Sequence, residues 1–198
     1  LALSTTASNN TAVGKDALYA NTTGANNVAV GSGSADALTT AGGTTAIGAL
    51  AMGTGVVTGD HNTAVGYAAG AVLTSGISNT FTGVVSGNST TTGSYNTAVG
   101  RSSLSANTTA SYNTAVGTSA LLANTTGAYN TASGYGAMLD NTTGEGNVAI
   151  GMYALRRNTT ASGNIAIGWD TLDENTTGAS NIAIGKQALQ QNKTSNNI

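Results

Sequence analysis

Three carboxylates, Asp170, Asp173 and Glu174, lie within one short stretch of the chain, directly after the single tryptophan, Trp169. Two carboxylates beside an aromatic side chain could hydrolyse a glycosidic bond, with one as the acid and the other as the base or nucleophile. The eight carboxylates share no repeated position in the sequence, so we expect most of them to be solvated charges. We therefore predict no catalytic residue, and a carbohydrate-active enzyme is the weaker hypothesis.

The only histidine, His61, follows Asp60, and a histidine beside a carboxylate can act as an acid–base group or as a metal ligand. We predict that His61 is an exposed loop residue. No P-loop, HExxH or GGxGxD calcium repeat occurs, and no cysteine is present to form disulfides or thiolate metal sites. We predict no cofactor and no metal.

Charge and hydropathy exclude two classes of partner. The chain has six Lys and Arg against eight Asp and Glu, a formal net charge of -2, which leaves no basic surface for nucleic acid. No apolar run is long enough to be a membrane-spanning helix, so we expect no membrane contact in this segment. At 39% hydrophobic and 7% charged residues, the composition is also unlike that of a disordered chain.

Aromatic residues recur at a fixed spacing in the middle of the chain, at Tyr95, Tyr112 and Tyr129. If these rings stack on a surface, they could contact sugar rings or a partner protein. A packing stripe is the equally weighted alternative. Arg156 and Arg157, close to Tyr153, form a second, basic and aromatic group.

The tripeptide Asn-Thr-Thr also recurs, and it admits two interpretations. It is a formal N-glycosylation acceptor, or it is a turn in which Asn and Thr side chains satisfy the backbone, and we favour the turn. Rows of Thr also raise an ice-binding hypothesis, but the adjacent Thr of this tripeptide should point to different sides. The asparagines that begin it are Asn21, Asn107, Asn124, Asn141, Asn158 and Asn175.

A 17-residue repeat, with the consensus N-[TVI]-A-[VI]-G-x-x-[AS]-L-x-x-N-T-T-G-x-x, underlies these spacings. Nine of the ten intervals between its anchor glycines are 17 residues, and the interval from Gly48 to Gly66 is 18. The repeat is marked by the anchor glycines Gly14, Gly31, Gly48, Gly66, Gly83, Gly100, Gly117, Gly134, Gly151, Gly168 and Gly185.

The repeat predicts an all-β, parallel β-solenoid (β-roll) of about eleven 17-residue coils. Gly and Asn-Thr-Thr in every repeat would break a helix, whereas β-branched residues favour strands. We expect two short strands and two turns in each coil, with the small-Leu segment as the second strand or as a bend. Val148 and Ile150 should point into a thin core with the Leu positions, and Ala149 should point away from it. Stacked asparagines should form hydrogen-bonded ladders.

The position of Ala149 is almost never polar, which is unexpected for a residue that faces solvent. We therefore predict that this column contacts another chain of a homo-oligomer, although alanine could instead fill a narrow interior. The predicted oligomer contacts are Ala12, Ala29, Ala46, Ala64, Ala98, Ala115, Ala132, Ala149, Ala166 and Ala183.

We treat residues 1–198 as a single repeat array that is irregular around residues 32–93. There the Asn-Thr-Thr tripeptide is lost, Phe81 replaces Ala, and the Leu position holds Ala35, Gly70 and Gly87. The pattern is interrupted at Leu1 and Ile198, so we expect a fragment of a longer fibrous chain.

The phrases NVAIG, NIAIG and NTAVG resemble the head repeats of trimeric autotransporter adhesins, and the longer form GTSALLANTTGAYNTASG resembles repeats of phage tail fibres. The resemblance covers essentially the whole chain. It implies a left-handed parallel β-roll packed as a homotrimer, located outside the cell on a bacterial surface or a virion tail fibre. A host-surface glycan or protein would be the receptor. The repeat is longer than in adhesin heads, which favours a fibre shaft over a binding head.

The leading functional hypothesis is a structural or adhesive extracellular fibre segment that acts as a rigid rod and offers a receptor-binding surface. A self-assembling extracellular filament is the alternative, because solenoid ends expose unpaired strand edges. An ice-binding solenoid and a carbohydrate-active enzyme are less favoured.

Overall fold

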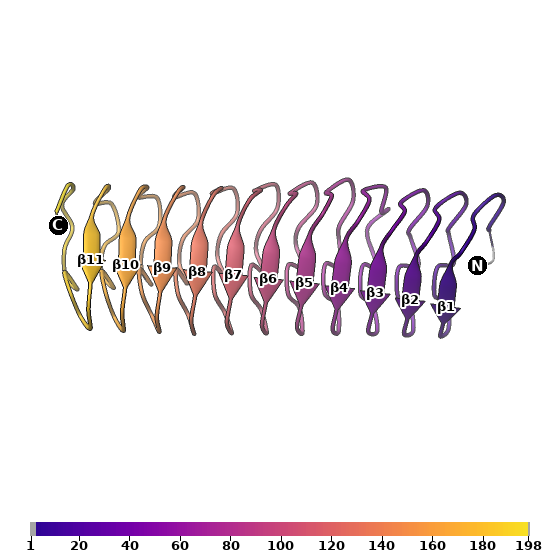
Figure 1. The fold of residues 1–198 in the computed structure, drawn as a ribbon, viewed down its shortest axis with the longest axis horizontal. Coiled ribbons are helices and arrows are strands. Elements are labelled where there is room, and N and C mark those ends of the chain that lie inside the picture. Colours follow the sequence, from indigo (N-terminus) through magenta and orange to yellow (C-terminus); the bar gives the residue numbers. More distant parts are fainter. Residues whose placement is uncertain (1–2, 198) are drawn as a thin grey trace.

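The computed structural model describes residues 3–197, so Leu1 and Ile198, where the repeat pattern is interrupted, lie outside the described residues. Eleven parallel strands form one sheet in chain order, and the described residues contain no helix (Figure 1). The all-β parallel solenoid is therefore confirmed. Its strands are β1 (Thr11–Val13), β2 (Val28–Val30), β3 (Thr45–Ile47), β4 (Thr63–Val65), β5 (Thr80–Thr82), β6 (Thr97–Val99), β7 (Thr114–Val116), β8 (Thr131–Ser133), β9 (Val148–Ile150), β10 (Ile165–Ile167) and β11 (Ile182–Ile184).

Each residue stacks on the equivalent residue of the next coil. Ala12 pairs with Ala29, 17 positions on, whereas Thr45 of β3 pairs with Thr63 of β4, 18 positions on. The extra residue lies between these two strands and leaves their register unchanged, since a loop absorbs an insertion more easily than a strand does. At the usual strand spacing of about 4.8 Å, eleven coils make a rod roughly 50 Å long.

Only one strand forms in each coil, so of the two alternatives predicted for the small-Leu segment, a second short strand or a bend, the strand is wrong and the segment is a turn. Leu104 and Leu121 instead have left-handed backbone angles, with φ of 51° and 50°. Such a conformation costs a non-glycine residue about 1–2 kcal/mol. It is held by stacking, because the Leu104 N–H donates to the Ala120 carbonyl of the next coil at 2.9 Å.

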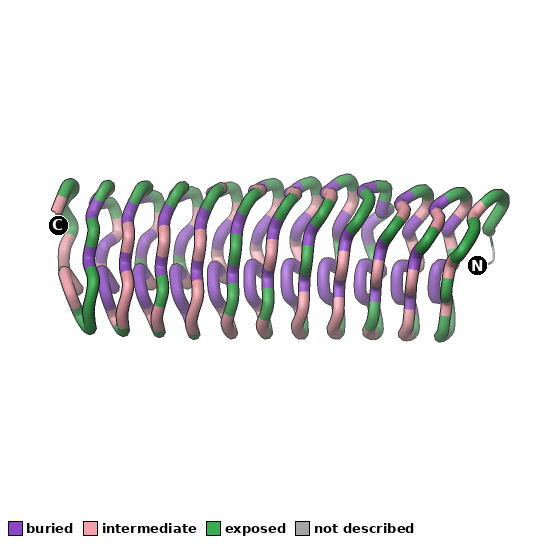
Figure 2. The backbone as a smooth tube through the Cα atoms, in the orientation of Figure 1, coloured by how far each residue is buried: buried purple, intermediate pink, exposed green. Residues whose placement is uncertain are grey.

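The alternation along each strand is confirmed, but its predicted direction is wrong. Ala149 has no exposed surface, while Ile150 beside it is 42% exposed. The middle residue of every strand from β2 to β11 is buried, and the first and third residues are exposed or half-buried (Figure 2). Alanine faces inward because the Leu column already occupies the thin interior and leaves room only for a methyl group. From β2 to β11 the Ala column thus belongs to the core of its own chain and is not available to a partner, while Ala12 of β1 is half-buried.

The asparagine before every strand except β3 forms the predicted ladder, and its side chain joins two coils. Asn130 is buried; its Nδ2 donates to the Gly144 carbonyl at 2.8 Å, and its Oδ1 accepts the Asn147 backbone N–H at 3.0 Å. Without the amide, the Asn147 N–H would be buried and unpaired, whereas the Gly144 carbonyl would keep the hydrogen bond from Asn141 Nδ2 at 3.1 Å. An amide supplies a donor and an acceptor on two separate atoms, so it can reach both coils at once, which explains why ten of the eleven coils have Asn here and only one has Thr, Thr44.

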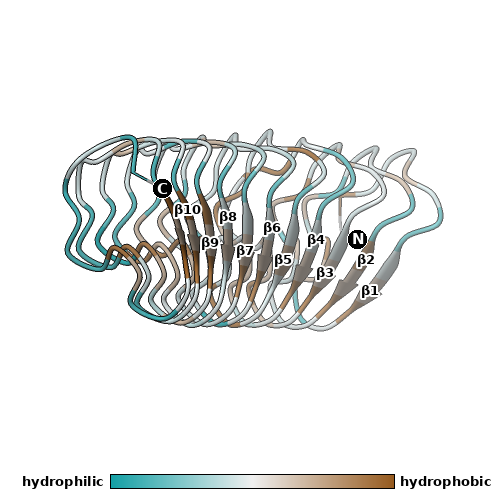
Figure 3. Cartoon of the chain, turned by 60° about the vertical axis from the view of Figure 1, so that its left-hand side comes forward, coloured by the Kyte–Doolittle hydropathy of each residue, from teal (hydrophilic) through white to brown (hydrophobic). Residues whose placement is uncertain are grey.

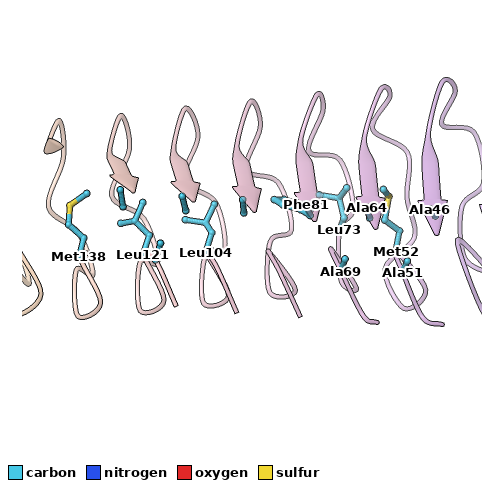
Figure 4. Packing of buried hydrophobic residues seen from close by; sticks show 14 of the residues in the cluster. Ala46, Ala51, Met52, Ala64, Ala69, Leu73, Phe81, Leu104, Leu121 and Met138 are labelled. Atoms are coloured by element: carbon cyan, nitrogen blue, oxygen red, sulfur yellow. The ribbon is translucent and has the colours of Figure 1, made fainter. Parts of the chain in front are cut away.

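The irregular region keeps its core by moving apolar volume to other positions. Leu38, Val57 and Leu73, which replace the polar tripeptide, are all fully buried. Phe81 is also fully buried, and its ring fills space left by Gly70 and Gly87: an added Cβ at Gly87 would lie 2.5 Å from Phe81 Cδ1. Figure 4 shows Leu104, Leu121 and Met138 on successive coils and the larger Phe81 ring further along the same core.

The anchor glycines are required by close contact between coils. Gly100 has φ of +132°, and a Cβ there would lie 2.6 Å from the carbonyl atoms of Gly117 in the next coil. Any side chain at this position would push neighbouring coils apart and lengthen the hydrogen bonds of the sheet.

Candidate functional site

The three repeated tyrosines form a stacked ladder on the surface. Tyr95 and Tyr112 have ring centroids 5.1 Å apart with an angle of 8° between ring planes, and Tyr112 and Tyr129 are 5.2 Å apart at 2°. All three are exposed, at 47%, 51% and 63% from Tyr95 to Tyr129. The structure therefore brings the predicted ligand-contact residues together in one column, outside the core.

A second aromatic and basic group lies near the C-terminal end. The Arg156 guanidinium lies 4.8 Å from the ring centroid of Tyr153, which makes an edge contact with Tyr135 at 5.3 Å. A hydrogen bond with Tyr135 raises the pKa of Tyr153 above its usual value of 10.0. Beyond it, the Lys186 ammonium lies 4.3 Å from the Trp169 ring. Trp169 and Lys186 each directly follow an anchor glycine, so the 17-residue spacing alone indicates that they stack on neighbouring coils.

Two of the three carboxylates near Trp169, Asp173 and Glu174, are paired with arginines. Arg156 donates to both oxygens of Asp173, at 2.7 and 2.8 Å, and this hydrogen bonding raises the pKa of Arg156. Arg157 lies 3.7 Å from Glu174. Each arginine contacts the carboxylate one coil further on, so these ion pairs tie neighbouring coils together.

Asp60 and His61 have local structural contacts. An Asp60 carboxylate oxygen accepts the Gly42 backbone N–H at 2.8 Å, and the exposed His61 ring lies over Gly43, where an added Cβ would be 2.9 Å from the ring. Within residues 3–197, no group of three or more His, Cys, Asp or Glu side chains is arranged to hold a metal ion.

The six asparagines of the Asn-Thr-Thr tripeptide are all buried, with no exposed surface. Asn124 is typical: its Nδ2 donates to the Gly127 carbonyl at 3.0 Å, while the next residue, Thr125, donates its hydroxyl to the Thr142 carbonyl at 3.1 Å. The turn interpretation is confirmed. A glycan on Nδ2 would remove these hydrogen bonds and would not fit inside the coil, so the glycosylation interpretation is wrong for this fold.

The first and third residues of strands β1 to β11 form an exposed surface, here called the sheet face. Every position on it is Val, Ile, Thr or Ser, and none is charged. It is most apolar at β9 to β11, where Ile184 is 68% exposed (Figure 3). At roughly 50 Å by 7 Å, or about 350 Å², this strip equals the largest apolar patches of ordinary monomers.

A polar depression near the N-terminal end is lined by Lys15, Asp16, Tyr19 and Asp36. Burial raises the pKa of Asp36, and one of its carboxylate oxygens is buried without a hydrogen-bond partner. The repeat does not predict this depression, because Asp36 occupies a position that other coils fill with unrelated residues.

Comparison with protein-family models, with curated proteins and with solved structures finds no match to this chain. Its fold defines the class: a parallel β-solenoid with one strand per coil. Residues 3–197 include no helix that is both long and apolar enough to cross a membrane.

Proposed function

We propose that this chain is a rigid segment of an extracellular fibre that assembles through its sheet face and presents a binding surface on its sides. The observation that carries the proposal is the charge-free, exposed sheet face along the whole rod. The face carries no charge that an interface would have to desolvate, and its apolar Val and Ile side chains at β9 to β11 gain most from being covered by a partner. The proposed interface is therefore the sheet face, in place of the buried Ala column.

Three chains are the expected number, because the repeats resemble those of trimeric adhesin heads and phage fibres. Each chain has its own core of Ala and Leu columns, so assembly would join folded rods side by side. A rod of this kind on a bacterial surface or virion would extend the binding surface away from its base. Several copies of a weak contact would add avidity without any new contact.

The test is the mass of the purified chain in solution, measured by light scattering or sedimentation at micromolar concentration. We expect three times the 19.2 kDa chain mass. The double variant Ile150→Lys/Ile184→Lys would place charges on the sheet face. An unpaired charge buried in an interface costs several kcal/mol, so the dissociation constant should rise about 100-fold or more.

The matched control is Thr143→Lys, which adds a charge at an exposed turn residue off the sheet face. It should leave the mass unchanged. A folded parent chain that remains monomeric at micromolar concentration would contradict the assembly proposal. Growth into indefinite fibres under the electron microscope would favour the filament alternative.

Ice binding is a second candidate function, and one observation favours it. The first residue of each strand from β3 to β8 is Thr, and all six point outward on consecutive coils. Within the described residues, none of these hydroxyls has a hydrogen-bond partner, unlike the turn hydroxyls of Thr125 and Thr142. The result is a flat, regular row of methyl and hydroxyl groups, the kind of surface that can order water. Two residues after each of these Thr, the third residue of the same strand also points outward, and it is Val, Ile, Thr or Ser.

Thermal hysteresis and the shape of ice crystals grown in the protein solution test this candidate. An ice-binding chain would shape ice as a monomer, and Thr97→Lys/Thr114→Lys would abolish the effect, because a charge interrupts the row. Thr109→Lys, at an exposed turn, is the matched control. Ordinary round ice crystals with the parent chain would exclude ice binding.

A further inference from the structure

At the C-terminal end of the tyrosine ladder, one face of the Tyr129 ring is not covered by another tyrosine. Both faces of Tyr112 are covered by its neighbours, and one face each of Tyr95 and Tyr129 is covered by Tyr112. Tyr129 is the most exposed of the three, at 63%. A ligand can therefore stack on a ring at an end of the ladder but not between the rings.

Beyond Tyr129, the same column holds no side chain for two coils. Gly146 and Gly163 occupy the equivalent positions, with φ of 63° and 70° against 59° for Tyr129, so the backbone continues unchanged. An added Cβ at Gly146 would have no atom within 4 Å, and one at Gly163 would first meet the Ser180 hydroxyl at 3.5 Å. The gap between Tyr129 and Ser180 is three coil spacings, about 14 Å, which admits a stacked ring.

The other end of the ladder differs. Tyr95 is followed toward the N-terminus by Ser78 and His61, both of which carry side chains in the left-handed conformation. The open stacking position is therefore specific to the Tyr129 end.

Glu145 places a negatively charged hydrogen-bond acceptor next to the open stacking position. It directly precedes Gly146, is exposed, and takes part in no ion pair among the described residues. Its backbone N–H donates to the Ser162 hydroxyl at 3.0 Å, which places a second polar residue beside the gap. The equivalent residue before Tyr129 is Ala128, so Glu145 adds a hydrogen-bond acceptor beside the stacking position. Neither the Tyr129 column nor the Glu145 column contains Lys or Arg.

We infer that Tyr129, Gly146 and Glu145 form a binding site for one neutral pyranose ring. The electron-rich face of Tyr129 attracts the C–H groups on one side of the sugar. The Glu145 carboxylate accepts a hydrogen bond from a sugar hydroxyl and disfavours acidic sugars. This inference rests on the proposed function, because it names the ligand class that the side of the fibre would bind.

Saturation-transfer NMR and calorimetry with the full chain and neutral glucose, galactose and mannose oligosaccharides test the site. We expect transfer to the ring C–H protons of at least one neutral sugar, and weaker binding of sialylated or uronic acid oligosaccharides. Gly146→Asn should lower the affinity about tenfold or more by filling the stacking position. Glu145→Ala should lower it about threefold. Asn26 has φ of 59° in the same column, so the backbone accepts asparagine.

The matched control is Ser180→Asn, in the same column at the far side of the gap, and it should leave the affinity unchanged. Binding of no neutral oligosaccharide, preference for acidic ones, or unchanged affinity in Gly146→Asn would each overturn the inference. The solution mass separates this result from the assembly proposal: an oligomer that binds no neutral sugar keeps the fibre function and loses this site.

Discussion

Phe81→Ala is expected to lower the free energy of unfolding by about 3–5 kcal/mol, the usual cost of removing a buried aromatic ring. The ring is fully buried and is flanked by Gly70 and Gly87, which carry no side chain to collapse into the cavity. Urea denaturation followed by circular dichroism measures the change. A loss below about 1 kcal/mol would contradict the packing described for this coil.

The double variant Phe81→Ala/Gly87→Leu tests whether Phe81 and Gly87 compensate each other in volume, or whether any substitution in this coil destabilises the fold. It recreates the Ala and Leu combination of the regular coils, such as Ala98 with Leu104. Leu104 and Gly87 have the same left-handed backbone conformation, so a leucine fits the backbone at position 87. Gly87→Leu alone should destabilise the fold, because its Cβ would lie 2.5 Å from the Phe81 ring. The two changes together should cost about 1–3 kcal/mol less than the sum of the single changes. Simple additivity would show that the ring and the glycine are independent.

Asn130→Ala is expected to cost about 1–3 kcal/mol, because it leaves the Asn147 N–H buried and unpaired, while the Gly144 carbonyl keeps its hydrogen bond from Asn141 Nδ2. Both partners are protected from solvent between two coils. Hydrogen exchange gives a local readout: the Asn147 amide should lose protection before amides of distant coils.

Asn26→Gly is the matched control for this ladder. Asn26 is exposed, has φ of 59° and directly precedes the ladder residue Asn27. Glycine accepts that backbone conformation without strain, so the stability should change by no more than a few tenths of a kcal/mol. An equal loss in Asn26→Gly and Asn130→Ala would show that the ladder has no special role.

The irregular region shows what cannot be predicted from each repeat position taken separately. Phe81, Gly70 and Gly87 each break a column, and separately they predict only a local distortion. In the structure they compensate one another, because the ring occupies the volume that two leucines fill elsewhere. Such compensation depends on which columns meet across the interior, and residue spacing alone does not contain that information.

The repeat by itself determined the all-β solenoid, the coil length, the stacking of like on like and the asparagine ladders. These features follow from local chemistry: glycine where coils approach closely, β-branched residues in strands, and an amide where a donor and an acceptor are both needed. The stacked positions of Tyr95, Tyr112 and Tyr129 followed from the same 17-residue spacing.

Only the tertiary structure decided which side of the strand is the inside. Alternation separates Ala149 from Val148 and Ile150, but it assigns neither side to the core, and the more hydrophobic side was the natural choice. The interior also has to hold the leucine column, and in a coil this thin only a methyl group fits opposite it. The valines and isoleucines are therefore placed on the surface, where they form the face that we propose for assembly.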